Sequence, residues 1–309
     1  MSASPCQSIK NYQELNDTIM KPSKFLKITS LPLLFFFSAF VISCNDENRL
    51  TLKDSQDIAE DALTDSYFED ADDMSSLALQ SDAATSGGAT AASSRQISVS
   101  DTRFCAGVVV NITMSPNSTP TVPVGTITIN FGTGCTDPRG NVRTGLITIS
   151  FTGRRFQPGS TVVWTTTDYT INGVELEGTR TLTNISGSTE ESPKFQIELE
   201  NGKATFPDGS VATREASFTR TWIRAASPVN DELRLDGSAE GTNRNGVAYT
   251  MAIQETLVFK RGCGFPVSGV KIYTKEGKQI TIDYGDGSCD RQVTYTVGDQ
   301  TITTNVGNN

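Results

Sequence analysis

From about residue 95 onwards the chain follows a period of two residues, in which apolar side chains alternate with small polar ones. Ile127, Ile129 and Phe131 alternate with threonine and asparagine, and residues 147–151 repeat the pattern. A side-chain period of two is typical of a β-strand with one buried face. No stretch in this part of the chain shows helical spacing. The alternation therefore predicts an all-β domain.

Five Asn-Gly or Asp-Gly dipeptides lie between or within the alternating runs and favour the positive φ of a tight hairpin. They are Asn172-Gly173, Asn201-Gly202, Asp208-Gly209, Asp236-Gly237 and Asn245-Gly246. Hairpins join antiparallel strands, whereas parallel strands need long crossover connections. We therefore expect an antiparallel multi-stranded sheet or sandwich of about a dozen strands.

A weak internal repeat suggests a duplication within this domain. The stretch TITINFGTG begins at Thr126, QITIDYGDG begins at Gln279, and each is followed within two residues by a cysteine and preceded by another one upstream. Four cysteines can form two disulfides in three ways, and a duplicated unit would carry its own bridge. The predicted pairs are Cys105 with Cys135 and Cys263 with Cys289. A thiolate metal site is the alternative, but the chain has no Cys-x-x-Cys pair.

The segment KPSKFLKITSLPLLFFFSAFVISCNDE, which begins at Lys21, combines three lysines, a short apolar run and Val-Ile-Ser-Cys. A helix that spans a bilayer needs about 20 apolar residues, and this run is too short, so it predicts a cleaved signal. Ser43 before Cys44 suits the lipoprotein signal peptidase. We expect residues 1–43 to be removed and Cys44 to carry a lipid that anchors the chain. Residues 1–19 lack signal character, and Met20 is a natural start.

Negative charge is concentrated between the lipid and the β domain. Residues 45–94 contain twelve acids against Arg49 and Lys53, whereas residues 95–309 contain 21 acids and 20 bases. A nearly neutral β domain without a basic block gives no support for nucleic-acid binding. An acidic segment is repelled by an anionic membrane surface and suits a spacer.

Residues 44–94 are accordingly interpreted as a lipidated acidic tether and linker, followed by a disulfide-stapled all-β domain over residues 95–309. Helical spacing within the tether predicts one short amphipathic helix. The apolar residues at this spacing are Ile58, Ala59, Ala62, Leu63, Tyr67, Met74, Leu77 and Ala78. The run of Gly, Ala, Ser and Thr over residues 81–94 predicts a flexible linker.

The chain contains no histidine. This excludes a Ser-His-Asp or Cys-His catalytic arrangement and any histidine-ligated metal site. Carboxylate pairs remain, but Glu198 and Glu200, like Glu175 and Glu177, are two residues apart on one strand and share a solvated face. The carboxylates of a glycosidase normally face each other across a cleft. We therefore expect no enzymatic activity.

Glu255 is the one acid on the apolar face of the run from Val247 to Phe259. An edge, a bulge or an ion pair explains it better than a catalytic acid. Trp222 shares an apolar face with Ala216 and Phe218, which predicts a core position. Trp164 has threonines around it and suits either the core or a platform on which a sugar could stack.

Three carboxylates, on Asp283, Asp286 and Asp290, surround a glycine-containing turn. Carboxylate oxygens are ligands for Ca²⁺, so a calcium site is one interpretation. The other is an Asp-rich tight turn whose side chains bond their own backbone. No other cofactor is indicated.

Two features resemble surface lipoproteins of the Bacteroidota. Asn45, Asp46 and Glu47 directly after the lipidated cysteine resemble their surface-export signal, and the stretch from Gly241 to Gly264 with the ending ITIDYGDGSCD resembles a recurrent pattern in uncharacterised lipoproteins of that group. The resemblance implies an outer-membrane lipoprotein, exposed at the cell surface. It implies no activity.

Three classes of function follow. A non-catalytic binding or structural module would show a long exposed polar sheet face and would bind a glycan or an envelope protein. A carrier of an apolar ligand would enclose an apolar cavity in a curved sheet. A carboxylate-based glycan hydrolase would bring carboxylates from different strands together in a pocket. The sequence favours the first.

Overall fold

The computed structural model describes residues 49–81, 94–185, 187–227, 230–261, 263 and 265–305. These residues form one long helix, α1 (Leu52–Gln80), and one sheet. The strands are β1 (Ser94–Ile97), β2 (Val109–Met114), β3 (Val124–Thr136), β4 (Val142–Thr152), β5 (Thr161–Ile171), β6 (Val174–Asn184), β7 (Lys194–Thr205), β8 (Val211–Ile223), β9 (Glu232–Thr242), β10 (Ala248–Lys260), β11 (Pro266–Lys275), β12 (Lys278–Asp286), β13 (Gln292–Val297) and β14 (Gln300–Asn305).

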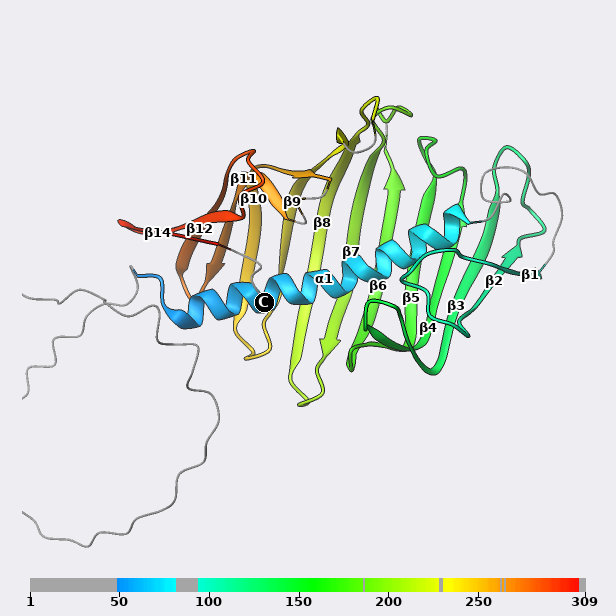
Figure 1. Ribbon diagram of the computed structural model, residues 1–309, viewed down its shortest axis with the longest axis horizontal. Coiled ribbons are helices and arrows are strands. Elements are labelled where there is room, and N and C mark those ends of the chain that lie inside the picture. The colour runs from blue at the N-terminus through cyan, green and yellow to red at the C-terminus, as the bar shows by residue number, and fades with distance from the viewer. Residues whose placement is uncertain are drawn as a thin grey trace, which may run out of the picture. The chain divides into compact units, whose positions relative to one another are not determined.

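The sheet has 14 strands in the order of the chain, and each strand pairs antiparallel with the next (Figure 1). This confirms the all-β, antiparallel prediction. Of the two architectures that the sequence left open, the described strands adopt a single sheet rather than a sandwich.

Helix α1 crosses one face of this sheet (Figure 1), beginning beside β12 and ending over β3 to β5. With 29 residues at a rise of 1.5 Å per residue it is roughly 43 Å long. We call the covered face the helix side and the opposite one the outer face. A wide sheet that has an apolar face must cover it, and α1 does so here.

The core lies between α1 and the inward positions of the strands. The alternating residues Ile127, Ile129 and Ile147 are fully buried, as the sequence predicts. Phe68 and Met74 of α1 are fully buried as well and belong to the same hydrophobic cluster. The helix is thus part of the folded unit.

The structure departs from the sequence analysis in the length and orientation of this helix. The segment was expected to form a short helix in a tether separate from the β domain. Ala59, Ala62 and Leu63 of its expected apolar face are exposed to solvent. The buried positions instead include four acids, Asp54, Asp57, Asp61 and Asp72. The expected apolar face is therefore only partly correct: Ile58, Met74 and Ala78 are buried, but cations on the sheet, described below, draw acids to the sheet as well.

Three of the five predicted turns join strands, namely those at Gly173, Gly209 and Gly246. Asn201-Gly202 and Asp236-Gly237 instead lie inside β7 and β9. The pairing of β7 with β8 shifts register between Leu199 and Gly202, and a Cβ on Gly202 would lie 2.4 Å from a backbone oxygen of β8. Glycine inside a strand marks a bulge or a close backbone approach, and it does so here.

Both predicted disulfides, Cys105–Cys135 and Cys263–Cys289, are present. The first joins the β1–β2 connection to the end of β3. The second joins the β10–β11 connection to the β12–β13 connection. The two bridges therefore lie towards opposite ends of the open sheet.

Removing the second bridge should destabilise the protein. The loop that it closes spans 26 residues, which corresponds to roughly 3–4 kcal/mol in the chain-entropy account. We expect the Cys263→Ser/Cys289→Ser double variant to lose stability on this scale in urea unfolding under oxidising conditions. Equal stability of the double variant and the wild type would show that the bridge does not form.

Candidate functional site

The sheet-facing side of α1 carries a stripe of acids spaced by three or four residues. Residues at this spacing lie on one face of a helix. The stripe consists of Asp54, Asp57, Asp61, Asp65, Glu69 and Asp72, and we call it the acidic stripe. Each member pairs with at least one cation from the sheet.

At the beginning of α1, Lys275 of β11 binds Asp57 and lies 2.8 Å from Asp54. The side chains of all three residues are at most 3 % exposed. Lys278 of β12 also binds Asp54, at 2.8 Å. Burial by itself would raise the pKa of Asp54, but the hydrogen bonds from Lys275 and Lys278 outweigh it and hold this pKa well below its usual range.

In the middle of α1, Arg214 of β8 binds Asp61 and lies 3.2 Å from Asp65. Its guanidinium also donates to the Tyr249 hydroxyl of β10, over 3.0 Å. Burial raises the pKa of Tyr249, so that this phenol stays protonated. The buried arginine thereby connects the helix to two strands.

Further along, Arg180 of β6 and Arg220 of β8 share Glu69 and Asp72. Trp164 of β5 donates its indole N–H to Asp72 over 3.0 Å. Burial raises the pKa of Glu69. It would also raise that of Asp72, but the neighbouring Arg180 and Arg220 lower it on balance.

The last of these contacts involves Arg143 of β4, which is fully buried. It lies 2.8 Å from Asp70 on α1 and 2.6 Å from Asp137 in the β3–β4 turn. Burial alone would raise the pKa of Asp137, but Arg143 and the backbone N–H of Asn141 lower it to about 2.

Over residues 54–73 of α1 these contacts form an ion-paired interface with the sheet, with little scope for acid–base chemistry. The lowered pKa values of Asp54, Asp72 and Asp137 mean that their pairs stabilise the fold fully above about pH 4, where the unfolded carboxyls are ionised. This stabilisation is lost as the pH falls towards the folded pKa values. The raised pKa of Glu69 acts in the opposite direction.

The outer face of the sheet is polar and rich in threonine. Thr128, Thr148, Thr165 and Thr179 stand directly opposite one another on the four consecutive strands β3 to β6. Threonine hydroxyls also hydrogen-bond across strands, as Thr213 does with Thr242 over 2.8 Å. Such cross-strand pairs stabilise a sheet while leaving its surface wettable.

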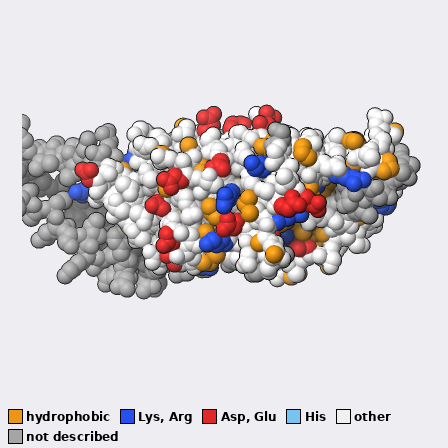
Figure 2. All heavy atoms as spheres, turned by 90° about the horizontal axis from the view of Figure 1, so that it is seen from above, with side chains coloured by type: hydrophobic (Ala, Val, Ile, Leu, Met, Phe, Trp, Pro, Cys, Tyr) orange, Lys and Arg blue, Asp and Glu red, His pale blue; other side chains and the backbone are white. Residues whose placement is uncertain are grey.

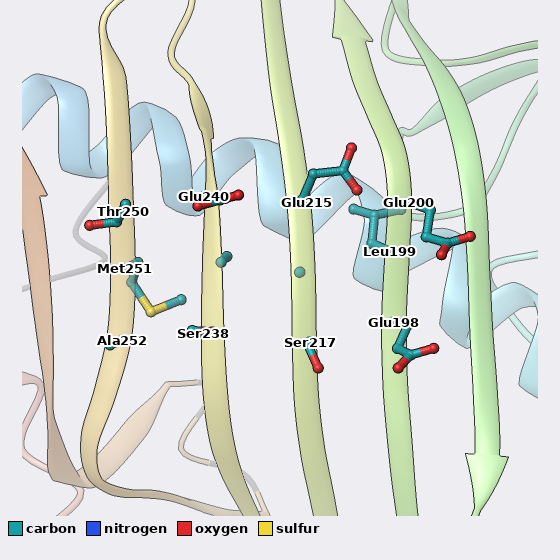
Figure 3. Close-up of a pocket in the computed structure, with 12 residues that line it drawn as sticks. Glu198, Leu199, Glu200, Glu215, Ser217, Ser238, Glu240, Thr250, Met251 and Ala252 are labelled. Atoms are coloured by element: carbon teal, nitrogen blue, oxygen red, sulfur yellow. The ribbon is translucent and has the colours of Figure 1, made fainter.

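A shallow groove of about 520 Å³ runs over the outer face across β7 to β10 (Figure 3). Glu198 and Glu200 of β7, Glu215 of β8 and Glu240 of β9 line it, and α1 lies on the far side of the strands. Glu215 stands directly opposite Glu240 in the register. Glu215 accepts a hydrogen bond from the Asn201 backbone N–H over 2.8 Å.

This groove brings carboxylates from three strands together, as the hydrolase hypothesis requires, but it does not remove them from water. All four glutamates are exposed. A carboxyl that acts as a general acid at neutral pH normally lies in a site from which water is excluded, and none of these four does. Like charges directly opposite each other on a sheet are also destabilising, so the groove suits contact with a partner better than catalysis.

The three aspartates proposed for calcium are engaged with their own turns. Asp283, Asp286 and Asp290 each accept a hydrogen bond from the backbone N–H two residues further on. This is the arrangement expected of an Asp-rich turn. Among the residues that the structure describes, no group of three or more acids or cysteines is placed to hold a metal ion.

Of the two tryptophans, Trp164 takes the core position that was one of its two expected places, whereas Trp222 does not lie in the predicted place. Trp164 is fully buried and stacks near Phe68 of α1, with ring centroids 6.5 Å apart. Trp222, expected in the core, is only half-buried. Its indole N–H donates to Asp231, and the guanidinium of Arg224 lies 4.6 Å from its ring. A near-terminal position on β8 places Trp222 at the loop edge rather than in the core.

The remaining acids singled out by sequence are on the surface. Glu255 lies at a register shift between β10 and β11 and is exposed, which confirms the bulge among its expected positions. Glu177 pairs with Lys203 over 2.7 Å, and Glu175 occupies a neighbouring outward position on β6.

Cys44 and the signal segment lie outside the described residues. Within the described ranges, no helix combines the length and the apolar character that crossing a membrane requires.

Searches of protein-family models, of curated proteins and of solved structures each find no match to the chain. The function is therefore argued from the geometry of the site.

The acidic stripe is the main feature that the sequence analysis did not predict. The sequence does contain a pattern that indicates it. The acids recur at helical spacing, and cations such as Arg180 and Arg214 occupy strand positions that the alternation assigns to the buried face.

Breaking one buried pair should destabilise the helix–sheet interface. Lys275→Met leaves Asp57 buried without its cation, which typically costs roughly 3–5 kcal/mol. Lys203→Met is the matched control, because it breaks the exposed pair with Glu177, and such pairs contribute little. Urea unfolding measures both. Equal effects of the two substitutions would contradict a structural role for the stripe.

Proposed function

We propose that the protein is a lipid-anchored envelope protein whose sheet serves as a non-catalytic binding module. The observation that carries the proposal is the division of the two sheet faces. On the helix side, α1 and its ion pairs occupy the surface. The outer face presents a broad array of threonine, serine and glutamate side chains.

The carrier hypothesis fits this arrangement less well. A carrier needs an apolar cavity of a few hundred cubic ångströms to enclose its ligand. Between α1 and the sheet, the described residues place Phe68, Met74 and buried ion pairs instead. Moving α1 away would expose unpaired charges as well as apolar surface.

The partner in this proposal is a glycan or an envelope protein that lies along the outer face. Hydroxyls donate and accept hydrogen bonds, which suits both classes of partner. The groove glutamates Glu198, Glu200 and Glu240 have no cation paired with them among the described residues, so basic groups on the partner would be favoured. The resemblance to surface lipoproteins of the Bacteroidota supports a position at the outer membrane.

The anchor is tested by replacing Cys44 with alanine. Without the lipid, the mature chain has no long apolar segment to hold it on a membrane, so we expect release into the soluble fraction. Detergent partitioning and palmitate labelling measure this. Continued membrane association of the Cys44→Ala protein would refute the lipoprotein assignment.

The binding surface is tested by placing a large cation in the groove. Ser238→Arg introduces a bulky side chain beside Glu240, whereas Asn117→Arg makes the same change in the β2–β3 connection, away from the groove. On glycan arrays and in pull-downs from envelope extracts, we expect the first variant to lose the partner and the second to retain it. Equal capture by both variants would argue against the outer face.

The same preparations should show no turnover of glycan, ester or peptide substrates. Hydrolysis that disappears in Glu240→Gln or Glu255→Gln would establish the enzyme alternative instead.

A further inference from the structure

The last two turns of α1 carry no acid to pair with the sheet. The acids of the helix end at Asp73, and residues 74–80 are uncharged. Three arginines nevertheless gather at this end of the interface. Arg154 and Arg155 lie in the β4–β5 connection, and Arg224 follows β8.

None of these three guanidinium groups forms an ion pair with any carboxylate of the described residues. Arg155 donates one long hydrogen bond, 3.4 Å, to the Ser76 hydroxyl. Arg154 donates to the Pro120 carbonyl, while its Nε and the Nε of Arg224 are buried without a hydrogen-bond partner. By contrast, Arg143 has two carboxylate partners on the same side of the sheet. Buried donors without partners are costly, so a missing acceptor is indicated.

A cavity of about 370 Å³ opens beside two of these arginines, Arg154 and Arg155. Arg154, Arg155 and Phe156 form one side, and the apolar side chains of Leu79 and Phe151 contribute to the rest. Figure 2 looks onto this loop edge and shows Lys and Arg side chains beside hydrophobic groups, with acidic side chains close by. The volume lies in the usual range for small-molecule sites and is about right for a ligand of monosaccharide size.

The position of Arg155 is fixed by the loop that carries it. Its carbonyl accepts hydrogen bonds from the buried Asn184 amide, over 3.0 Å, and from the Ser160 hydroxyl, over 3.2 Å. Two guanidinium groups lie over the Phe156 ring, that of Arg155 at 5.3 Å and that of Arg224 at 4.6 Å from its centroid. The cations are therefore held in place before any ligand arrives.

Arg155 has cationic neighbours as well as two acids in its surroundings, Asp72 and Asp73, neither of which forms an ion pair with it. Burial lowers the pKa of Arg155 to about 10, and the nearby Arg220 contributes to this shift. The side chain is still cationic at neutral pH. Glu190 also lines the cavity, but it is exposed and makes no ion pair with these arginines.

We propose that this cavity binds a sugar-sized ligand that carries an oxyanion, with Arg155 as its main contact and Arg154 as the supporting cation. Guanidinium groups bind carboxylate, phosphate and sulfate through paired, charge-assisted hydrogen bonds. The apolar walls would contact the body of the ligand. The site is on the helix side, so it stands independently of the partner proposed for the outer face.

Titration calorimetry with the mature full-length chain tests the proposal. The probes are glucuronate, glucose 6-phosphate and glucose 6-sulfate at millimolar concentration, with glucose as the neutral counterpart. We expect at least one anion to bind and glucose not to bind. Arg155→Gln should weaken the affinity by about tenfold or more. Arg234→Gln, which removes an exposed arginine of β9, should leave it unchanged.

Arg155→Gln should fold normally because no ion pair is lost, and its thermal unfolding temperature checks this. The proposal is overturned if no anion binds, if glucose binds as tightly as the anions, or if a folded Arg155→Gln protein binds as well as the wild type.

Discussion

The pairing of the acidic stripe with cations of the sheet is the interaction on which the rest of the fold depends. Removing charges from water is costly, and the attraction inside the protein repays this cost only where each charge finds a partner at close range. Here Lys275, Arg214 and Arg180 each meet two acids of α1. Buried ion pairs add less net stability than apolar contacts of similar volume. A helix position that left one of these charges buried without a partner would, however, be strongly destabilised. The stripe therefore selects one position and direction for the helix.

That selection determines what each face of the sheet can do. An open sheet of 14 strands exposes two faces, and only one of them is apolar enough to need a cover. With α1 in place, the core closes and the ion pairs of Asp54, Asp57, Asp61 and Asp72 are buried. The threonine-rich outer face and the groove at Glu215 and Glu240 remain accessible. The proposed binding role follows from this asymmetry, and the arginine cavity lies where the acids of the helix run out.

Local pattern predicted the strands and the disulfide pairing well. Ile127 and Ile129 are buried because the period of two is a local property of an extended chain. The turn aspartates such as Asp283 behave as expected because their hydrogen bonds span only two residues. The glycines were less informative. Gly202 was expected in a turn but lies at a bulge in β7, where the backbone of the neighbouring strand β8 comes close.

Long-range partners were the part that local pattern could not supply. Asp57 and Lys275 are 218 residues apart. Nothing in the residue spacing of either segment indicates that the two side chains form a pair. Without these partners, the acidic segment predicted a solvated spacer, whereas charge pairing buries four of its acids, Asp54, Asp57, Asp61 and Asp72. Trp222 is a second example. The alternation correctly places it in a strand, but it lies near the end of β8, at the loop edge, where the core does not extend.

Hydrogen–deuterium exchange of the α1 amides in the mature full-length chain at neutral pH tests the central claim most directly. If ion pairing holds the helix on the sheet, the amides of residues 55–80 should exchange as slowly as those of the central strands, and Lys275→Met should accelerate them more than Lys203→Met does. Exchange of α1 at the rate of a free peptide, with the strands still protected, would show that the helix does not belong to the folded unit and would contradict the account.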